Sequence, residues 1–400
     1  MPELPPALDL AFNPFEPAAS GPPIGIPFSP SSPLESRLRD LVQTLAHARG
    51  PKVIVILGDY GAGKTCLLQW LHDDLLPEHR IRPYYFDNPG VHFYALANTL
   101  LRTIGRKDFA KFIWELAGPY VETPYQQSLF RTSFEEYLLA ESRPTRRPRQ
   151  EIAAPLQAAI MAARVTADEQ IAHCLARIVT DAVRKPYFEY RDFLPRGKES
   201  LVAEAEEARY FGAILKTLSR GSGAAATAFL IDEFEEIGLQ KRLTRRAAHD
   251  YLSTLKRLIN LTLKEDNPFW LFLSMTPDAY RTTCDLETGL QQRFTERDGV
   301  LEIESLQPDD ITALMRSRLD AARPRTPENA PRPRLFPFPD DLPFSPATLA
   351  NPRRLVKVCS SALSAADETT AVPFTSAYLR DIEAKIFSTG SDGAQDALGS

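Results

Sequence analysis

The stretch VIVILGDYGAGKTCLLQWL, Val53 to Leu71, decides the fold. It begins with an apolar run, Val53 to Leu57, of the kind expected for a buried strand. Glycines follow at positions 58, 61 and 63, and Lys64 and Thr65 come directly after them. Glycine destabilises regular structure, so a cluster of glycines needs a backbone reason. We interpret the cluster as a loop whose peptide N–H groups hold a triphosphate.

The loop matches a phosphate-binding pattern. Its residues fit G-x-x-x-x-G-K-[ST] without a mismatch. In this pattern backbone N–H groups surround the phosphates, and the helix that follows presents its positive end. Lys64 would supply a cation to the phosphate oxygens, and Thr65 a hydroxyl to Mg²⁺. The alternative is a flexible glycine turn beside a surface lysine. The predicted nucleotide-binding residues are Gly58, Asp59, Tyr60, Gly61, Ala62, Gly63, Lys64, Thr65 and Cys66.

A second stretch, TAFLIDEFEEI at 227–237, predicts a buried strand that ends in carboxylates. A triphosphate with magnesium needs a carboxylate held nearby, and we assign that role to Asp232. Hydrolysis also needs a general base, and we assign Glu233 to polarise the attacking water. Glu235 and Glu236 are expected in a solvated helix start. The alternative for the first two carboxylates is a helix N-cap after a core strand.

Composition limits the class of protein. The 400 residues suffice for two or three domains, and 44% hydrophobic with 25% charged residues is typical of soluble globular proteins. No apolar run approaches the roughly 20 residues that cross a bilayer. The N-terminus lacks the features of a signal peptide, so we expect a cytoplasmic protein. The four cysteines are too scattered for a disulfide framework or a zinc site. A net charge of −5 argues against a nucleic-acid-binding surface over the whole molecule.

Alternating apolar strands and amphipathic helices predict an α/β fold, a three-layer αβα sandwich with a parallel sheet. The chain between Lys64 and Asp232 is far longer than one β-α unit, so a large helical insertion must fill it. We expect Phe12, Phe15, Ile24, Ile26 and Phe28 to anchor an extended arm. The predicted regions are a Pro-rich arm at 1–33, a nucleotide-binding core at 34–90 and 209–304, the insertion at 91–208, and a helical lid with a Pro/Arg-rich linker at 305–400.

Together these motifs resemble an AAA+ P-loop ATPase, nearest to the origin-recognition and helicase-loader group, and loosely ATPases of bacterial defence or mobile-element systems. FNPFEP resembles the adenine-side N-terminal segment of such ATPases, and LFLSMT occupies the place of sensor 1. GLQQRF resembles the arginine-finger box, and LANPRRLVKVC the sensor 2 helix of the lid. Many relatives carry asparagine at sensor 1, where this chain has Ser or Thr. The implied residues are Thr276 or Ser274 for sensor 1, Arg293 for the finger, and Arg353 or its rival Arg354 for sensor 2.

Each of these assignments has a simpler alternative. Thr276 would serve as the cap of a helix that begins at Pro277. Arg293, Arg353 and Arg354 would be ordinary surface residues.

The resemblance implies an ATPase that uses ATP and Mg²⁺, with Arg293 completing the site of a neighbouring subunit in a homo-oligomer. One hypothesis is a loader or remodeller of a DNA-associated complex. The alternative is a nucleotide-controlled signalling or scaffold switch in bacterial defence, with slow hydrolysis and a protein partner at the insertion. Glu233 disfavours a small-molecule kinase. The first hypothesis draws on basic clusters that would equally suit a solvated linker: Arg143, Arg146, Arg147 and Arg149, and Arg323, Arg325, Arg332 and Arg334.

Overall fold

A computed structural model describes most of the chain. The described residues are 4–16, 32–46, 52–120, 133–136, 150–182, 189–193, 204–239, 243–264, 269–295, 299–323 and 334–388. Contacts divide the chain into two compact units. The smaller unit comprises residues 1–36, 58–70 and 302–400, and the larger unit comprises residues 37–57 and 71–301.

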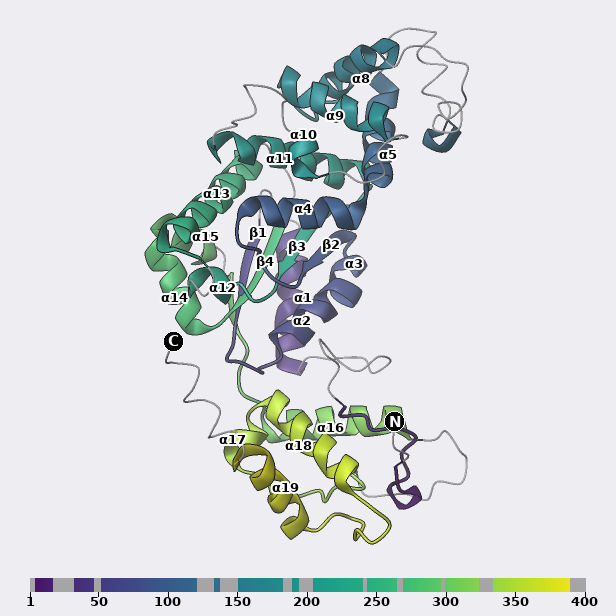
Figure 1. Ribbon diagram of the computed structural model, residues 1–400, viewed down its shortest axis with the longest axis vertical. Coiled ribbons are helices and arrows are strands. Elements are labelled where there is room, and N and C mark those ends of the chain that lie inside the picture. The colour runs from purple at the N-terminus through teal and green to yellow at the C-terminus, as the bar shows by residue number, and fades with distance from the viewer. Residues whose placement is uncertain are drawn as a thin grey trace. The chain divides into compact units, whose positions relative to one another are not determined.

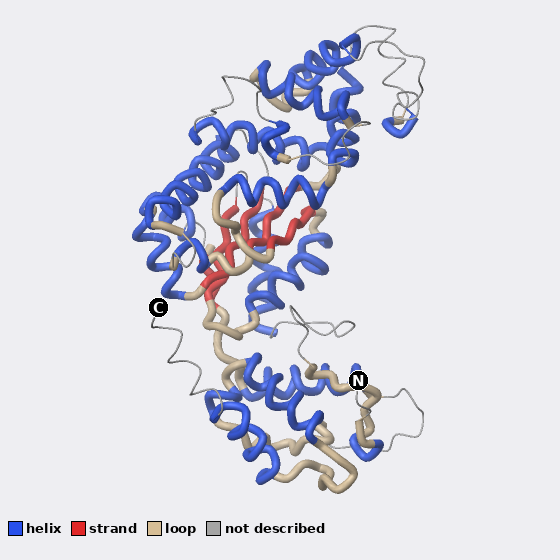
Figure 2. The backbone as a smooth tube through the Cα atoms, viewed as in Figure 1, coloured by secondary structure: helices blue, strands red, loops and turns tan. Residues whose placement is uncertain are grey.

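A five-stranded parallel sheet forms the centre of the larger unit (Figures 1 and 2). The strands are β1 (Lys52–Leu57), β2 (Ile81–Phe86), β3 (Ala226–Ile231), β4 (Phe269–Met275) and β5 (Val300–Glu302), in the order β2-β3-β4-β1-β5. Every residue of β1, β3 and β4 is buried, as expected for parallel strands covered on both faces. Ile231 at the end of β3 lies in register with Phe86 of β2 and Leu273 of β4. The predicted α/β fold is confirmed.

Helices account for most of the remaining described chain. Between β1 and β2 lie α2 (Lys64–Trp70), the π-helix η2 (Leu71–Leu75) and α3 (Leu76–Glu78). Between β2 and β3 lie α4 (Phe93–Ile104), α5 (Arg106–Ala117), η3 (Gly118–Tyr120), α8 (Gln150–Ala162), α9 (Glu169–Asp181), α10 (Tyr190–Phe193) and α11 (Glu204–Gly221). After β3 come α12 (Glu235–Gly238), α13 (Arg245–Lys264), α14 (Pro277–Leu286) and α15 (Thr288–Thr295). The rest are η1 (Pro6–Leu8), α1 (Ser32–Ala46), α16 (Pro308–Ala322), α17 (Pro346–Leu349), α18 (Pro352–Ala365) and α19 (Ser376–Ser388).

The helical region between β2 and β3 confirms the predicted insertion as an architectural feature, and it is joined to the sheet by aromatic packing. Phe93 of α4 meets Phe211 of α11 at 5.0 Å between ring centroids, edge to face. Phe211 in turn contacts Phe229 of β3 at 6.0 Å. Such pairs contribute beyond the apolar area that they bury. Parts of the insertion, including the basic segment Arg143–Arg149, lie outside the described residues.

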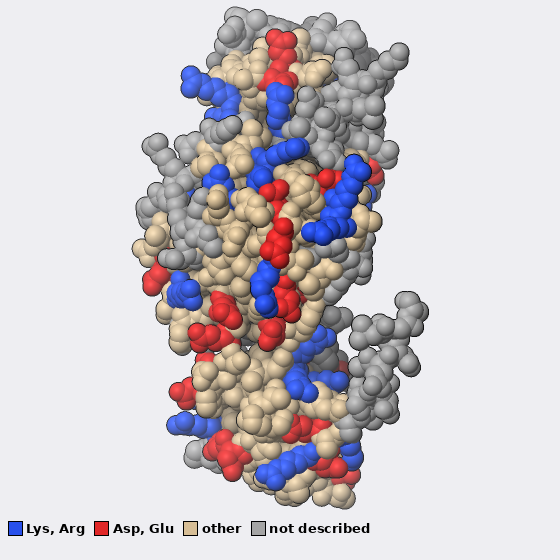
Figure 3. All heavy atoms as spheres, turned by 90° about the vertical axis from the view of Figure 1, so that its left-hand side faces the viewer, with Lys and Arg blue, Asp and Glu red and all other residues tan. Residues whose placement is uncertain are grey.

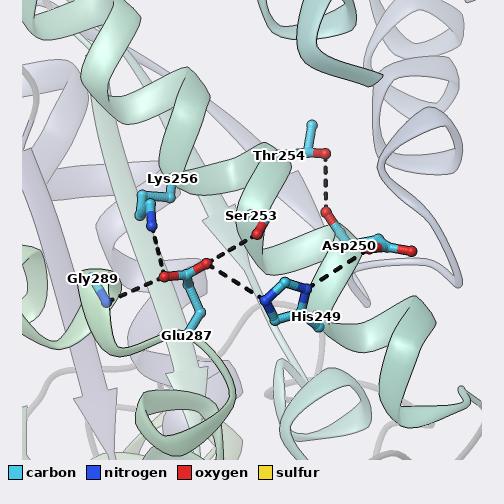
Figure 4. Close-up of polar contacts among 7 residues, drawn as sticks. All are labelled: His249, Asp250, Ser253, Thr254, Lys256, Glu287 and Gly289. Atoms are coloured by element: carbon cyan, nitrogen blue, oxygen red, sulfur yellow. Dashed lines mark hydrogen bonds and ion pairs between the residues drawn. The ribbon is translucent and has the colours of Figure 1, made fainter. Parts of the chain in front are cut away.

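A buried carboxylate ties α13 to the junction between α14 and α15 (Figure 4). Glu287 accepts hydrogen bonds from Lys256 Nζ at 2.7 Å, Ser253 Oγ at 2.9 Å and Gly289 N at 3.2 Å, and His249 Nε2 lies 4.0 Å away. Burial alone would raise the pKa of Glu287, but the Lys256 ammonium and the Ser253 and Gly289 donors outweigh it and hold that pKa below its usual range. This network fixes the helices that follow β4.

The smaller unit has its own apolar core, formed by α16, α18, α19 and the N-terminal arm. Phe15 is fully buried, and its ring meets Phe338 edge to face at 5.8 Å. Asn13 Nδ2 donates to the carbonyl oxygen of Ser360 at 3.1 Å. The expected anchoring of the arm is therefore confirmed at Phe15 but is wrong for Phe12, which is 39% exposed. The other three anchors, at positions 24, 26 and 28, lie outside the described residues.

Two further expectations concern the chain as a whole. None of the described helices combines the length and the apolar character needed to span a membrane. The four cysteines, Cys66, Cys174, Cys284 and Cys359, form no disulfide with one another.

Candidate functional site

The glycine loop connects β1 to α2 as its sequence predicts. β1 ends at Leu57 and α2 begins at Lys64. Gly61 and Gly63 have φ values of 81° and 100°, in the left-handed region that favours glycine. Lys64 Nζ donates to the carbonyl oxygens of Gly58 at 2.8 Å and of Asp59 at 3.3 Å. The Lys64 ammonium therefore lies against the carbonyl oxygens of its own loop.

The start of α18 packs against this loop within the smaller unit. Asn351 Nδ2 donates to the carbonyl oxygen of Tyr60 at 2.9 Å, and Arg353 N donates to that of Gly61 at 3.3 Å. A Cβ placed on Gly61 would lie 2.7 Å from both Asn351 Oδ1 and Arg353 Cβ, closer than real Cβ atoms come to such neighbours. Gly61 therefore has two reasons to be glycine, its φ angle and this close approach.

The two arginines proposed for sensor 2 differ in whether they contact this loop. Arg353 is exposed, and its backbone and Cβ lie beside Gly61 of the loop. Arg354 instead has its guanidinium 4.2 Å from the centroid of the Phe387 ring on α19, a cation–π contact between two half-buried side chains. Of the two, Arg353 is the residue that lies against the predicted nucleotide loop.

Asp232 follows β3 directly and is held by donors from both neighbouring strands of the larger unit. It is only 3% exposed. Ser274 Oγ of β4 donates to Oδ1, and Tyr85 Oη of β2 donates to Oδ2 at 3.1 Å. The backbone N–H of Glu233 donates to Oδ1 at 2.9 Å. These donors fix the carboxylate in one orientation, which suits a metal ligand. Sequence patterns did not identify Tyr85 as a partner of Asp232. The alternation of side chains along β2 does not show that the residue after the end of β3 lies beside it.

Glu233 differs from Asp232 in exposure and in backbone conformation. Its side chain is exposed, and its φ is 49°, which an L-residue other than glycine seldom adopts. Strained backbone of this kind occurs often at functional sites. The expectation of a solvated helix start is wrong for Glu235, which begins α12 but is 3% exposed. The carboxylates after β3 thus occupy distinct environments.

The remaining predicted residues have contacts of their own. Thr276 is the N-cap of α14, with its Oγ1 accepting from Ala279 N at 3.3 Å, which agrees with the simpler alternative for this residue. Of the two sensor 1 candidates, Ser274 is the one bonded to Asp232. Arg293 of α15 is half-buried, and its Nη2 donates to Asn260 Oδ1 of α13 at 2.9 Å.

The fixed carboxylate of Asp232 suits a magnesium ion that is supplied together with a nucleotide. Among the described residues, no group of three or more His, Cys, Asp and Glu side chains is arranged to hold a metal ion by itself. Mg²⁺ prefers oxygen ligands and is usually bound through one or two carboxylates together with substrate phosphates. Within the larger unit, the single fixed carboxylate of Asp232 matches that chemistry.

Comparisons of the chain with protein-family models, with curated proteins and with solved structures gave no match. The family resemblance therefore rests on the motifs and on the fold that contains them.

Proposed function

We propose that this chain binds ATP with Mg²⁺ and hydrolyses it, as an AAA+ ATPase. The observation that carries the proposal is the complete G-x-x-x-x-G-K-T loop between a buried parallel strand and a helix. β1 and β3 are parallel and separated only by β4, so Leu57 and Ile231 end at the same edge of the sheet. Ligands of open α/β sheets bind outside that carboxyl edge.

Each proposed role follows from the chemistry of its residue. Backbone N–H groups of residues 58–66 would bind the phosphates, and Lys64 would neutralise their charge. Thr65 and Asp232 would hold Mg²⁺, which supplies charge stabilisation at the phosphates when bound. Glu233, exposed and held in a strained conformation, would take a proton from the attacking water. Arg353 would assist at the phosphates, since it lies beside Gly61.

The first candidate for the biological role is a loader or remodeller of a DNA-associated complex. Its support is the resemblance, because six of the eight clustered arginines lie outside the described residues. Arg323 donates to Asp320 at 2.8 Å and to the Phe336 carbonyl oxygen at 3.0 Å. On the face drawn in Figure 3, the described acidic and basic side chains are interspersed and form no broad basic patch.

The second candidate is a nucleotide-controlled signalling or scaffold switch. One observation favours it: Arg293, the proposed finger, already donates to Asn260 of its own chain. Reaching a neighbouring nucleotide would require that bond to be given up, which suits slow hydrolysis that is controlled by assembly. The protein partner would bind the helical insertion.

ATP hydrolysis by the purified protein tests the enzymatic proposal. We expect Mg²⁺-dependent phosphate release from the wild type and loss of release in Asp232→Asn and Glu233→Gln. The same assay with duplex DNA over a range of salt separates the two roles. Salt-dependent DNA affinity that stimulates hydrolysis supports the loader, and nucleotide-dependent assembly without a DNA effect supports the switch. Phosphate release that is unchanged in both variants would contradict the assigned chemistry.

A further inference from the structure

The two oxygens of the Asp232 carboxylate are held from opposite sides by hydroxyl groups of different strands. Ser274 of β4 donates to Oδ1, and Tyr85 of β2 donates to Oδ2 at 3.1 Å. β2 and β4 flank β3 in the sheet, so the carboxylate at the end of β3 lies between them. The strand register brings this about, since Tyr85 pairs with Leu230, two residues before Asp232. The arrangement lies wholly within the larger unit.

Packing alone does not account for a tyrosine at position 85. Its neighbours Tyr84 and Phe86 are buried, and both rings contact Phe229 of β3. Tyr85 has the opposite strand parity and is half-buried, so its side chain leaves that aromatic cluster. A phenylalanine there would provide the same ring but no donor for Asp232.

The phenol of Tyr85 supplies a hydroxyl donor to the Asp232 carboxylate. It donates a charge-assisted hydrogen bond, stronger than one between neutral groups.

We propose that Tyr85 is a positioning residue for magnesium: its hydroxyl fixes the Asp232 carboxylate in the orientation that receives Mg²⁺ with the nucleotide. The inference rests on the proposed function of Asp232. Mg²⁺ demands a nearly ideal octahedral arrangement, so a carboxylate that can rotate is a poorer ligand. Groups that orient a metal ligand typically contribute about 10- to 100-fold in metal affinity. Tyr85 thus tunes metal binding without touching the metal or the phosphates.

The test measures binding of a fluorescent ATP analogue to the full chain as Mg²⁺ is varied, and again in EDTA. Tyr85→Phe keeps the ring and removes the donor. Tyr84→Phe is the matched control, because it removes the hydroxyl of the adjacent residue, whose ring packs on Phe229. We expect all three proteins to bind equally in EDTA. We expect the half-saturating Mg²⁺ concentration to rise about 10- to 100-fold in Tyr85→Phe alone. Thermal unfolding of each variant verifies that its fold is retained.

The possible failures are distinguishable. If the wild type binds nucleotide and responds to Mg²⁺ while Tyr85→Phe behaves as Tyr84→Phe does, the positioning role is wrong and the proposed function stands. If Tyr85→Phe weakens binding equally in EDTA and in Mg²⁺, the residue supports the fold rather than the metal, and the inference is again wrong. If the wild type binds no nucleotide under either condition, the proposed function is wrong and this inference is wrong as well.

Discussion

At the scale of single residues, Glu233 carries both a proposed chemical role and a local strain. The left-handed region disfavours L-side chains by about 1–2 kcal/mol per residue, because Cβ approaches the following carbonyl oxygen. A glutamate that is kept there despite this disadvantage indicates that its position matters more than its backbone preference. The neighbouring Asp232, buried and bonded to three donors, provides the fixed point from which Glu233 extends.

We predict that Glu233→Gly and Glu233→Ala differ in stability but not in activity. Both remove the carboxylate, so both should bind ATP and fail to hydrolyse it. Glycine adopts a φ of 49° readily and alanine does not, so the glycine variant should be the more stable by about 1 kcal/mol. Urea unfolding and phosphate release measure the two effects. Equal stability of the two variants would show that the backbone at position 233 is not strained. Residual hydrolysis would show that another group is the general base.

At the scale of elements, the start of α18 is the most informative feature of the smaller unit. Asn351 serves two functions with one amide group. Its Oδ1 accepts from Arg353 N and Arg354 N and so caps the helix, while its Nδ2 donates to Tyr60 O of the glycine loop. A helix cap and a loop contact are thereby joined in a single side chain.

Two substitutions at position 351 separate these functions. Asn351→Ser keeps a capping oxygen but is too short to reach Tyr60, so it should lose about 0.5–1.5 kcal/mol for the missing hydrogen bond. Asn351→Ala loses the cap as well and should be less stable again, by roughly 1 kcal/mol. Urea unfolding gives both values. The account of this contact is wrong if the serine variant is as stable as the wild type, or if the two variants are equally stable.

Local patterns in the sequence predicted elements well and long-range contacts poorly. The glycine loop between β1 and α2, the buried strands and the acidic end of β3 were predictable because each is a continuous stretch with its own periodicity or motif. The helix cap at Asn351 is also a local signal, an asparagine just before Pro-Arg-Arg. Its bond to Tyr60 joins residues 291 positions apart, and the bond from Tyr85 to Asp232 joins residues 147 apart. Such pairs depend on strand order and packing, which no local pattern specifies.

At the scale of the whole molecule, the proposed assembly would let one chain complete the nucleotide site of another. Arg293 is the proposed finger, and such an arginine contributes about 10³–10⁵ in rate in other NTPases. We predict that Arg293→Ala and Glu233→Gln, each inactive alone, regain part of the hydrolysis when mixed. In a mixed assembly, some sites would combine an intact Glu233 with an intact Arg293 from the neighbour. If the mixture hydrolyses no more ATP than the separate variants do over a range of protein concentrations, Arg293 does not complete a neighbouring site.

If the loop after β1 binds a triphosphate, the purified chain must take up nucleotide. Isothermal titration of the purified chain with ATP and Mg²⁺ should show saturable binding, with ADP competing for the same site. Lys64→Ala should abolish that binding, because it removes the cation that lies against the loop carbonyls of Gly58 and Asp59. Thermal unfolding without nucleotide should confirm that the variant is folded. A folded wild type that takes up neither ATP nor ADP, or a Lys64→Ala variant that binds as tightly as the wild type, would contradict the account.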